Sequence, residues 1–187
     1  MCGFAGFVGE VENREQVLEN MIDTIIHRGP DSSGKFVDED AALGFRRLSI
    51  IDLSESGDQP LYNEDRSKVL VFNGEIYNYQ ELREELIQAG HTFVSNTDSE
   101  TLIHGYEQWG EELVYRLRGM YAFAIWDQKA KRLFSARDIF GIKPLYYAQM
   151  NGTLMFGSEI KSFLEHPKFD KVFNEDALGN YLSFQFR

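Results

Sequence analysis

The sequence predicts an α+β fold with mostly antiparallel sheets. Segments rich in Val, Ile, Leu and Phe cluster in the middle and at the end of the chain. The helical patterns are grouped and do not alternate strictly with these segments, which argues against a doubly wound parallel sheet. Asn151-Gly152 joins two apolar segments and is typical of a tight hairpin turn. A chain of 187 residues suits one domain with a core that needs no cross-links.

Strands are predicted where β-branched and aromatic residues run between turn signals. They are expected at residues 3–9, 43–53, 68–77, 120–127, 132–137, 144–149 and 153–157. Helices are predicted from apolar residues that recur on one face. They are expected at residues 14–26, 79–89, 97–108 and 158–165, with one more after Asn174. The apolar face of the first helix comprises Val17, Leu18, Met21, Ile22, Ile25 and Ile26.

Two of these helices carry the spacing of a capping box, in which a polar N-cap is followed three residues later by Glu. Asn78 with Glu81 and Thr97 with Glu100 fit this spacing. The residues after His166 end in the middle of a pattern, so we expect residues 1–165 to form the domain and residues 166–187 to begin a connection to something longer.

Charge and composition exclude several classes of partner. The net charge is −11, and such a surface repels nucleic acid and anionic lipid. No apolar run approaches the roughly 20 residues that span a bilayer, and no basic segment precedes the apolar N-terminus as in a secretory signal. A single cysteine rules out an internal disulfide and favours a reducing compartment. We therefore expect a cytoplasmic protein without nucleic acid or membrane partners.

The only cysteine, Cys2, follows the initiator methionine. Its plainest interpretation is a small buried hydrophobic residue in a short strand. Removal of Met1 would instead put the thiol and a free α-amino group on one residue. Such an amine has a pKa of about 7.7–8, so a fair fraction is neutral and can act as the base for an N-terminal nucleophile. The position alone leaves both interpretations open.

Asn73-Gly74 also has two interpretations. Asn-Gly between apolar segments is the strongest short hairpin signal, and the pattern by itself favours a turn. The alternative is an oxyanion hole, in which the Asn side chain and the Gly backbone N–H bind a developing negative charge. The glycines at positions 3, 6 and 9 do not match a dinucleotide-binding loop, and Gly3 is better explained by a close backbone approach.

Arg47 and Asp98 are single charges that have plain roles as a solvated strand residue and a helix N-terminal carboxylate. Together they could hold an α-amino acid, with Arg47 on its carboxylate and Asp98 on its ammonium group. The histidines at positions 27, 91, 104 and 166 lack metal-ligand spacing, so no metal is expected. His27 lies at a helix end and is an alternative base for Cys2.

Six segments resemble, in order, the glutaminase domain of glutamine-hydrolysing asparagine synthetases, which are class II glutamine amidotransferases. They are MCGFAGFVG at the N-terminus, HRGPDSSG at 27–34, RRLSIIDLSESGDQPL at 46–61, FNGEIYNY at 72–79, NTDSE at 96–100 and ARDIFGIKPLYY at 136–147. The resemblance covers nearly the whole chain. It implies a four-layer α/β/β/α sandwich of antiparallel sheets of the N-terminal-nucleophile hydrolase type.

The resemblance also implies a role for each matching residue. Cys2 would be the nucleophile with its own amine as base, and Asn73 and Gly74 would form the oxyanion hole, against the hairpin interpretation. Arg47, Glu75 and Asp98 would bind glutamine. Arg28 and Gly29 would support the nucleophile. The reaction would form a thioester, release ammonia and end in hydrolysis to glutamate.

Relatives of this kind carry a second, C-terminal synthetase domain that uses ATP and Mg and captures the ammonia for asparagine synthesis from aspartate. Its phosphate-binding motif is absent from this sequence, so no cofactor is expected for the domain itself. Two alternatives remain: a Cys2–His27 hydrolase acting on another substrate, and an inactive binding module with the same fold. The acceptor of the ammonia and the oligomeric state, a homodimer included, are left open.

Overall fold

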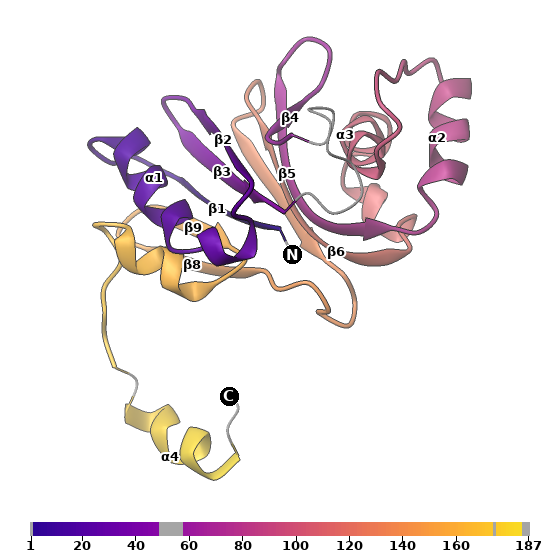
Figure 1. Cartoon of the computed structure of the whole chain (residues 1–187). Coiled ribbons are helices and arrows are strands. Elements are labelled where there is room, and N and C mark those ends of the chain that lie inside the picture. Colours follow the sequence, from indigo (N-terminus) through magenta and orange to yellow (C-terminus); the bar gives the residue numbers. More distant parts are fainter. Residues whose placement is uncertain (1, 49–57, 174, 185–187) are drawn as a thin grey trace.

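The computed structural model describes residues 2–48, 58–173 and 175–184 (Figure 1). Within these ranges the chain forms two antiparallel sheets. The five-stranded sheet has the order β2-β3-β1-β9-β8, with β1 at Gly3–Val8, β2 at Ser32–Val37, β3 at Ala41–Arg47, β8 at Tyr146–Met150 and β9 at Thr153–Gly157. The four-stranded sheet has the order β4-β5-β6-β7, with β4 at Leu61–Tyr62, β5 at Lys68–Ile76, β6 at Gly119–Asp127 and β7 at Arg132–Arg137.

All helices except α4 lie around the outer faces of the two sheets (Figure 1). The four α-helices are α1 at Arg14–Asp23, α2 at Tyr79–Gln88, α3 at Asp98–Trp109 and α4 at Glu175–Phe184, and the 3-10 helices are η1 at Ile26–Arg28, η3 at Gly110–Tyr115 and η4 at Ile160–Glu165, all within the described residues. Helix α1 and η4 pack on the five-stranded sheet, whereas α2 and α3 pack on the four-stranded sheet. The predicted four-layer α/β/β/α sandwich is confirmed.

Most predicted elements are confirmed to within a few residues, and the differences have local causes. The helix predicted at 158–165 is a 3-10 helix, and the first helix ends at Asp23. Ile26, predicted to lie on the apolar face of that helix, is 48% exposed because the chain has turned into η1 by then. The strand predicted at 43–53 ends at Arg47, and its last residues, 49–53, lie outside the described residues. Strands β2 and β4 and the helix η3 were not predicted.

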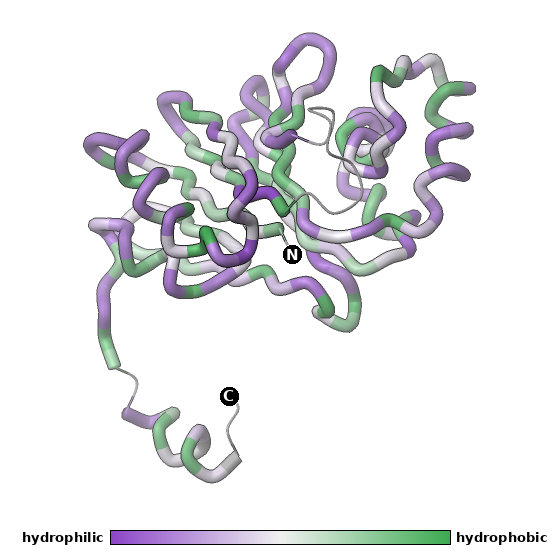
Figure 2. The backbone as a smooth tube through the Cα atoms, viewed as in Figure 1, coloured by the Kyte–Doolittle hydropathy of each residue, from purple (hydrophilic) through white to green (hydrophobic). Residues whose placement is uncertain are grey.

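Alternation along β5 explains how one strand serves two cores. Val69 and Val71 face the five-stranded sheet, and Leu70 and Phe72 face α3 on the opposite side. A strand that is buried on both faces reads as an unbroken apolar run. Figure 2 shows this hydrophobic stretch along β5, while the loops at the edges of the sandwich are largely hydrophilic. The unbroken apolar run of β5 therefore identifies a strand that is buried on both faces.

The two predicted capping boxes are wrong in detail. Neither Asn78 nor Thr97 makes a side-chain capping hydrogen bond. Asn78 instead bridges to the segment before β6, where its side chain donates to the carbonyl of Arg116 and accepts from the N–H of Arg118, both at 2.9 Å. Glu100 reaches back to accept from the N–H groups of Val94 and Ser95, both at 2.7 Å. Each polar side chain bonds to another segment of the chain, which spacing within one helix cannot indicate.

Helix α4 stands apart from the sandwich in Figure 1. Leu178, Tyr181 and Leu182 are exposed on it, as expected from a pattern with nothing to pack against. The division of the chain at residue 165 stays a prediction. None of the helices in the described ranges combines the length and apolar character of a membrane span.

The close packing of β1 against its neighbours gives a test of the fold. A Cβ atom added at Gly6 would lie 2.5 Å from the Ala42 carbonyl oxygen and 2.5 Å from the Phe156 ring. We expect Gly6→Ala to lower the free energy of unfolding by about 1–3 kcal/mol, since overpacking a dense core forces backbone shifts. Chemical denaturation measures this change. The control is Gly179→Ala in α4, where an added Cβ meets nothing within 4 Å, and it should cause no loss. Equal stability of the Gly6 variant and wild type would contradict the packing.

Candidate active site

The lone cysteine and Asn73 approach the same layer of the sandwich from opposite sheets. Cys2 precedes β1 and packs, half-buried, against the apolar core between the sheets, on the same side as Phe4. Asn73 shares the face of β5 that carries Val69 and Val71. Because side chains alternate along a strand, Asn73 points toward the five-stranded sheet. The sandwich thus directs a thiol and a carboxamide to one place.

The hairpin interpretation of Asn73-Gly74 is wrong. Both residues lie inside β5, where Asn73 pairs with Ala122 and Gly74 pairs with Tyr121 of β6. A Cβ atom at Gly74 would lie 2.3 Å from the carbonyl oxygen of Met120. The glycine therefore permits close strand packing and does not form a turn.

Asn73 has the environment of a preorganised hydrogen-bond donor. Its side chain is 3% exposed, and its Nδ2 atom has no hydrogen-bond partner among the described residues. A buried donor without a partner costs free energy, roughly 1–3 kcal/mol, unless a ligand satisfies it. An unsatisfied amide that lines a cleft is therefore ready to bind an acceptor atom.

A cleft of about 420 Å³ joins these residues. Its lining consists of Cys2, Leu48, Gln59, Phe72, Asn73, Gly74, Thr97, Asp98, Ser99 and Lys143. Four residues to which the sequence assigned a role, Cys2, Asn73, Gly74 and Asp98, line this one cleft. They come from the N-terminus, from the middle of β5 and from the start of α3.

Backbone hydrogen bonds hold Cys2 in place. The thiol donates to the Leu48 carbonyl at 3.7 Å and accepts from the Leu48 N–H at 3.4 Å. The carbonyl of Cys2 accepts from Nε of Arg28 at 3.0 Å. A Cβ atom at Gly3 would lie 2.8 Å from the Arg28 side chain, so glycine makes room for this contact.

Glu159 anchors Arg28 from the far end of the chain. Nη1 of Arg28 donates to Oε1 of Glu159 at 3.1 Å. Burial alone would raise the pKa of the Glu159 carboxyl, but the Arg28, His27 and Lys161 side chains outweigh it and hold that pKa below the ordinary value. Glu159 therefore stays ionised and keeps Arg28 against the backbone of Cys2. The structure brings Arg28 to the place where the resemblance expected a supporting residue.

The structure does not bring His27 to the thiol. Nε2 of His27 lies 2.9 Å from Oε1 of Glu159, and its Nδ1 lies 3.4 Å from Nζ of Lys161. Half of the side chain is exposed, and His27 is not part of the cleft lining. Both ring nitrogens are engaged in a surface cluster, so a Cys2–His27 dyad has no geometric basis here.

Asp98 is the first residue of α3, and it lines the cleft. Its Oδ2 atom accepts from the N–H of Ile76 at 2.9 Å, which ties the start of α3 to the end of β5. Burial raises the pKa of the Asp98 carboxyl, the negative charge of Glu75 raises it further, and backbone N–H groups only partly oppose the increase. Glu75 itself is exposed and lies outside the cleft lining. The two carboxylates form an acidic end of the site.

Arg47 is the last residue of β3, and Gly29 packs against the backbone of that strand. Nη1 of Arg47, which is buried, donates to Oδ1 of Asp58 at 2.7 Å, and Arg47 is not part of the cleft lining. Its guanidinium thus already holds a carboxylate. A Cβ atom at Gly29 would lie 2.4 Å from the backbone of Arg46, so Gly29 lets the segment with Arg28 pack on β3.

Sequence reasoning gave no site role to four polar residues of the cleft, Gln59, Thr97, Ser99 and Lys143. Gln59 and Lys143 are the two with a distinct place in the site. Gln59 pairs with the backbone of Phe72 in both directions, at 2.6 Å and 3.1 Å, and so extends the edge of β5. Lys143 is 8% exposed and is the single cation of the described lining, and it forms no ion pair within the described residues. Both lie in motifs quoted above, RRLSIIDLSESGDQPL and ARDIFGIKPLYY, and this was the only available signal.

The loop that carries Lys143 is organised by Asp138. The buried Asp138 carboxylate accepts from the backbone N–H groups of Tyr121, Phe140, Ile142 and Lys143, at 2.9–3.2 Å. Burial acts to raise the pKa of this carboxyl, but the four donors outweigh it and hold the pKa below its usual value. An ionised Asp138 therefore fixes the backbone of Lys143 at the cleft.

Comparison with known sequences agrees with this geometry. A family described as "Glutamine amidotransferase domain" matches residues 1–187, the full length of the chain. The chain belongs to the glutamine amidotransferase family. We refer to it below as the amidotransferase domain.

The amidotransferase domain is similar in sequence to glutamine-hydrolysing asparagine synthetases. It is 48% identical over 191 residues to asparagine synthetase [glutamine-hydrolyzing] 1 of Bacillus subtilis, matching 100% of this chain and 30% of that protein. It is 44% identical over 167 residues to an asparagine synthetase [glutamine-hydrolyzing] of Zea mays, matching 87% of this chain and 28% of that protein. The chain thus spans about a third of the length of these relatives.

Solved structures support the fold. Glutamine phosphoribosylpyrophosphate amidotransferase from B. subtilis superposes with a TM-score of 0.73 over 87% of this chain and 43% of the other, at 22% identity. A structure described as the allosteric regulatory enzyme of purine biosynthesis gives a TM-score of 0.76, also at 22% identity, over 88% of this chain and 43% of the other. At this identity the likeness supports the sandwich architecture alone.

The fold raises the pKa of Asp98 and lowers the pKa of Asp138, so the two carboxyls predict opposite changes of stability with pH. The raised folded-state pKa of Asp98 means that the folded protein binds a proton more readily than the unfolded chain does. Stability therefore falls as pH rises from 3.8, the ordinary pKa, through the raised pKa of Asp98. Asp98→Asn removes this loss, so at pH 7 its thermal midpoint should equal or exceed that of wild type.

Asp138→Asn is the control of opposite sign. The lowered pKa of Asp138 means that its ionised form stabilises the fold above pH 3.8, and this stabilisation is lost as pH falls through the lowered pKa. An amide there presents N–H groups to backbone donors, so the variant should melt several degrees lower at pH 7. Thermal melts of both variants between pH 3 and pH 8 measure the effect. A thermal midpoint of Asp98→Asn far below that of wild type at pH 7 would contradict the raised pKa of Asp98.

Proposed function

We propose that the amidotransferase domain hydrolyses glutamine to glutamate and ammonia through a thioester on Cys2. The single observation that carries the proposal is the buried, unpartnered amide donor of Asn73 in the same cleft as the only thiol. An oxyanion hole needs such a donor fixed in advance, because it then binds the developing charge without reorganisation. The match of the whole chain to the glutamine amidotransferase family supports glutamine as the substrate.

The proposed reaction has two steps. Sγ of Cys2 attacks the carbon of the substrate side-chain amide while Nδ2 of Asn73 and the N–H of Gly74 donate to the amide oxygen. The carbon–nitrogen bond then breaks, and the nitrogen leaves as ammonia with the proton that the thiol gave up. Water attacks the thioester, which releases glutamate and restores the thiol.

The α-amine of Cys2 is the proposed base. It becomes available once Met1 is removed, and its pKa of about 7.7–8 lets it accept the thiol proton near neutral pH. Support comes from the position of His27, the rival base, whose ring nitrogens are taken up by Glu159 and Lys161. Within the described residues, both hydrogen bonds of the thiol go to the backbone of Leu48.

Charged residues in and near the cleft are proposed to select an α-amino acid. Asp98, with Glu75 beside it, would bind the ammonium group of glutamine, since two close carboxylates favour a cation between them. Arg47 would bind the α-carboxylate. Its guanidinium already pairs with Asp58, and a planar group with five N–H donors can hold or exchange a second carboxylate.

In a longer parent protein we propose that the ammonia feeds ATP-dependent synthesis of asparagine from aspartate. The named activity of the B. subtilis and Zea mays relatives supports this, and the chain matches their N-terminal 28–30%. ATP and Mg would then belong to a C-terminal synthetase domain that begins after residue 165, and the amidotransferase cleft would work without a cofactor. A cytoplasmic location and assembly as a homodimer complete the proposal for the parent.

Ammonia release from glutamine by three forms of the chain tests the function and the base together. The processed chain, with Cys2 at its N-terminus, should be active. A chain that retains Met1 should lose at least about 100-fold in kcat, because an amide nitrogen cannot take the thiol proton. Cys2→Ala should release no ammonia above background while unfolding within about 1 kcal/mol of the processed chain.

His27→Ala is the control for the rival dyad. It should retain the activity of the processed chain, since His27 belongs to the surface cluster around Glu159. Full activity with Met1 attached, combined with an inactive His27 variant, would reject the N-terminal amine and favour the dyad. Ammonia release by Cys2→Ala would reject the nucleophile. An inactive processed chain that is fully folded would favour the binding-module alternative.

Asn73→Ala should separate transition-state stabilisation from substrate binding. Loss of one oxyanion donor should lower kcat by about 100-fold to 1,000-fold and change KM little. Removing a buried, unpartnered polar group should leave the thermal midpoint near that of wild type. Arg47→Ala is the comparison: it should raise KM and change kcat less, because it contacts a substrate group far from the scissile amide. A KM effect alone in the Asn73 variant would contradict its role.

A further inference from the structure

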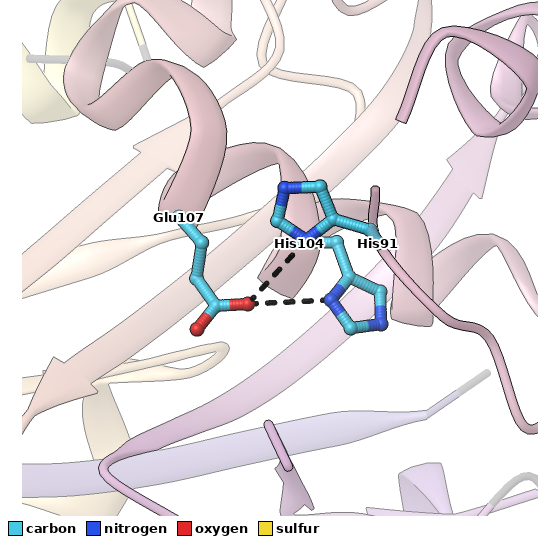
Figure 3. A group of neighbouring side chains, drawn as sticks. All are labelled: His91, His104 and Glu107. Atoms are coloured by element: carbon cyan, nitrogen blue, oxygen red, sulfur yellow. Dashed lines mark hydrogen bonds and ion pairs between the residues drawn. The ribbon is translucent and has the colours of Figure 1, made fainter. Parts of the chain in front are cut away.

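We propose that His91, His104 and Glu107 form a binding site for a divalent transition-metal ion of the zinc type. The three side chains come from the α2–α3 connection and from α3, away from the cleft. One ligand atom from each residue lies within 4.8 Å of the other two. Figure 3 shows the Glu107 carboxylate facing both imidazole rings. The site departs from the sequence-based expectation that no histidine is a metal ligand.

The distances between the ligand atoms are close to those expected around a bound ion. Oε2 of Glu107 lies 3.3 Å from Nδ1 of His104 and 3.9 Å from Nδ1 of His91. Ligand atoms at about 2.0–2.2 Å from a tetrahedral zinc ion are roughly 3.4 Å apart. Small side-chain rotations therefore suffice to close the three atoms around a metal.

The outer contacts of the histidines direct Nδ1 toward the proposed ion. Nε2 of His91 lies 3.1 Å from Oε1 of Gln108 and must donate to it, because an amide oxygen only accepts. A neutral His91 ring then presents the lone pair of Nδ1 to a carboxylate oxygen. Two acceptors that face each other repel unless a cation lies between them.

His104 is the buried histidine of the group, and its Nδ1 atom lies within hydrogen-bonding distance, 3.3 Å, of Oε2 of Glu107. Its Nε2 atom lies 3.6 Å from Oε1 of Glu100, while its Nδ1 atom faces Glu107. The ring is 2% exposed, so its orientation is fixed by packing. An ion that replaces the proton between Nδ1 and Glu107 would leave the ring N–H on Nε2, facing the Glu100 carboxylate, which is the usual arrangement of a metal-bound histidine.

Glu107 is held in the same way. Its outer oxygen, Oε1, accepts from Nδ2 of Asn63 at 2.7 Å and lies 3.7 Å from Nζ of Lys68. Oε2 faces the two imidazole rings, so an ion that displaces the proton between Oε2 and Nδ1 of His104 can bind there. Oε1 of Glu64 lies 3.7 Å from Nδ1 of His104 and is the available fourth ligand. Two neutral imidazoles and two carboxylates balance the charge of a divalent ion, and imidazole nitrogen selects zinc-type metals over Mg²⁺ or Ca²⁺.

Occupation of the site would secure the segment that leads into the cleft. His91 begins the connection from α2 to α3, and Thr97, Asp98 and Ser99 at its far end line the cleft. A metal that joins His91 to the middle of α3 would fix both ends of this segment on one helix. The inference concerns metal binding and does not depend on the proposed reaction.

Calorimetric titration with Zn²⁺ alone tests the proposal, using the full chain after treatment with a chelator. The titrations use a Cys2→Ser background, because the thiol is a competing ligand for zinc. We expect one Zn²⁺ per chain and a rise in thermal midpoint on binding. His91→Ala and Glu107→Gln should each weaken binding by more than about 100-fold, and Gln108→Ala, which removes only an outer partner, by about 10-fold to 100-fold.

His27→Ala is the matched control, since His27 is also a histidine beside a carboxylate, at 2.9 Å from Glu159. It should bind Zn²⁺ as the parent does. Co²⁺ in place of Zn²⁺ should give the strong visible absorption of a four-coordinate site, which His91→Ala abolishes. The proposal would be overturned if Zn²⁺ does not bind stoichiometrically. It would also be overturned if the His91 and Glu107 variants bind Zn²⁺ as the parent does while their metal-free forms melt unchanged. Either result would mean that hydrogen bonds alone hold the cluster. Loss of binding in His27→Ala would also overturn it.

Discussion

The structure depends on the packing of the two sheets against each other. Phe4, Leu43 and Phe45 from one sheet interdigitate with Val69, Val71 and Trp126 from the other. Nε1 of Trp126 also donates to Oδ2 of Asp38 at 2.8 Å, which fixes one sheet relative to the other through a partly buried polar contact. Because Cys2 and Asn73 extend the inward faces of β1 and β5, this packing determines where thiol and amide meet. A shift of one residue in either register would turn them away from each other.

The N-terminus needs a second restraint, because the first residues of a chain are usually poorly ordered. Here β1 is a central strand, paired with β3 on one side and β9 on the other. The Arg28–Glu159 pair then holds the carbonyl of Cys2 from a segment near the opposite end of the described chain. Removal of Met1 would expose a free amine on a residue that is already positioned, so the catalytic group proposed here requires little reorganisation.

The acidic end of the cleft is linked to the proposed metal site through α3. Asp98 at the first turn of α3 accepts from the backbone of β5, and His104 and Glu107 follow one and a half to two and a half turns later on the same helix. Glu100 lies between them and binds both the preceding segment and, at 3.6 Å, the His104 ring. A buried helix with this many carboxylates needs compensating cations or protons. The same helix therefore carries the groups that we propose to bind substrate and the groups that we propose to bind a metal.

The order and type of most elements could be predicted from the sequence, because apolar periodicity and turn residues are local properties; Asn151-Gly152 does form the predicted hairpin between β8 and β9. The candidate residues Cys2, Asn73, Gly74 and Asp98 could be found through motifs, although Asn73-Gly74 by pattern alone indicated a turn. Tertiary structure decided the rest. It placed Asn73 in a strand interior, engaged His27 with Glu159, gave Arg47 a carboxylate partner in Asp58 and brought His91 beside His104. These outcomes depend on contacts between segments far apart in the chain. The free energies of such contacts cannot be read from a local pattern of residues.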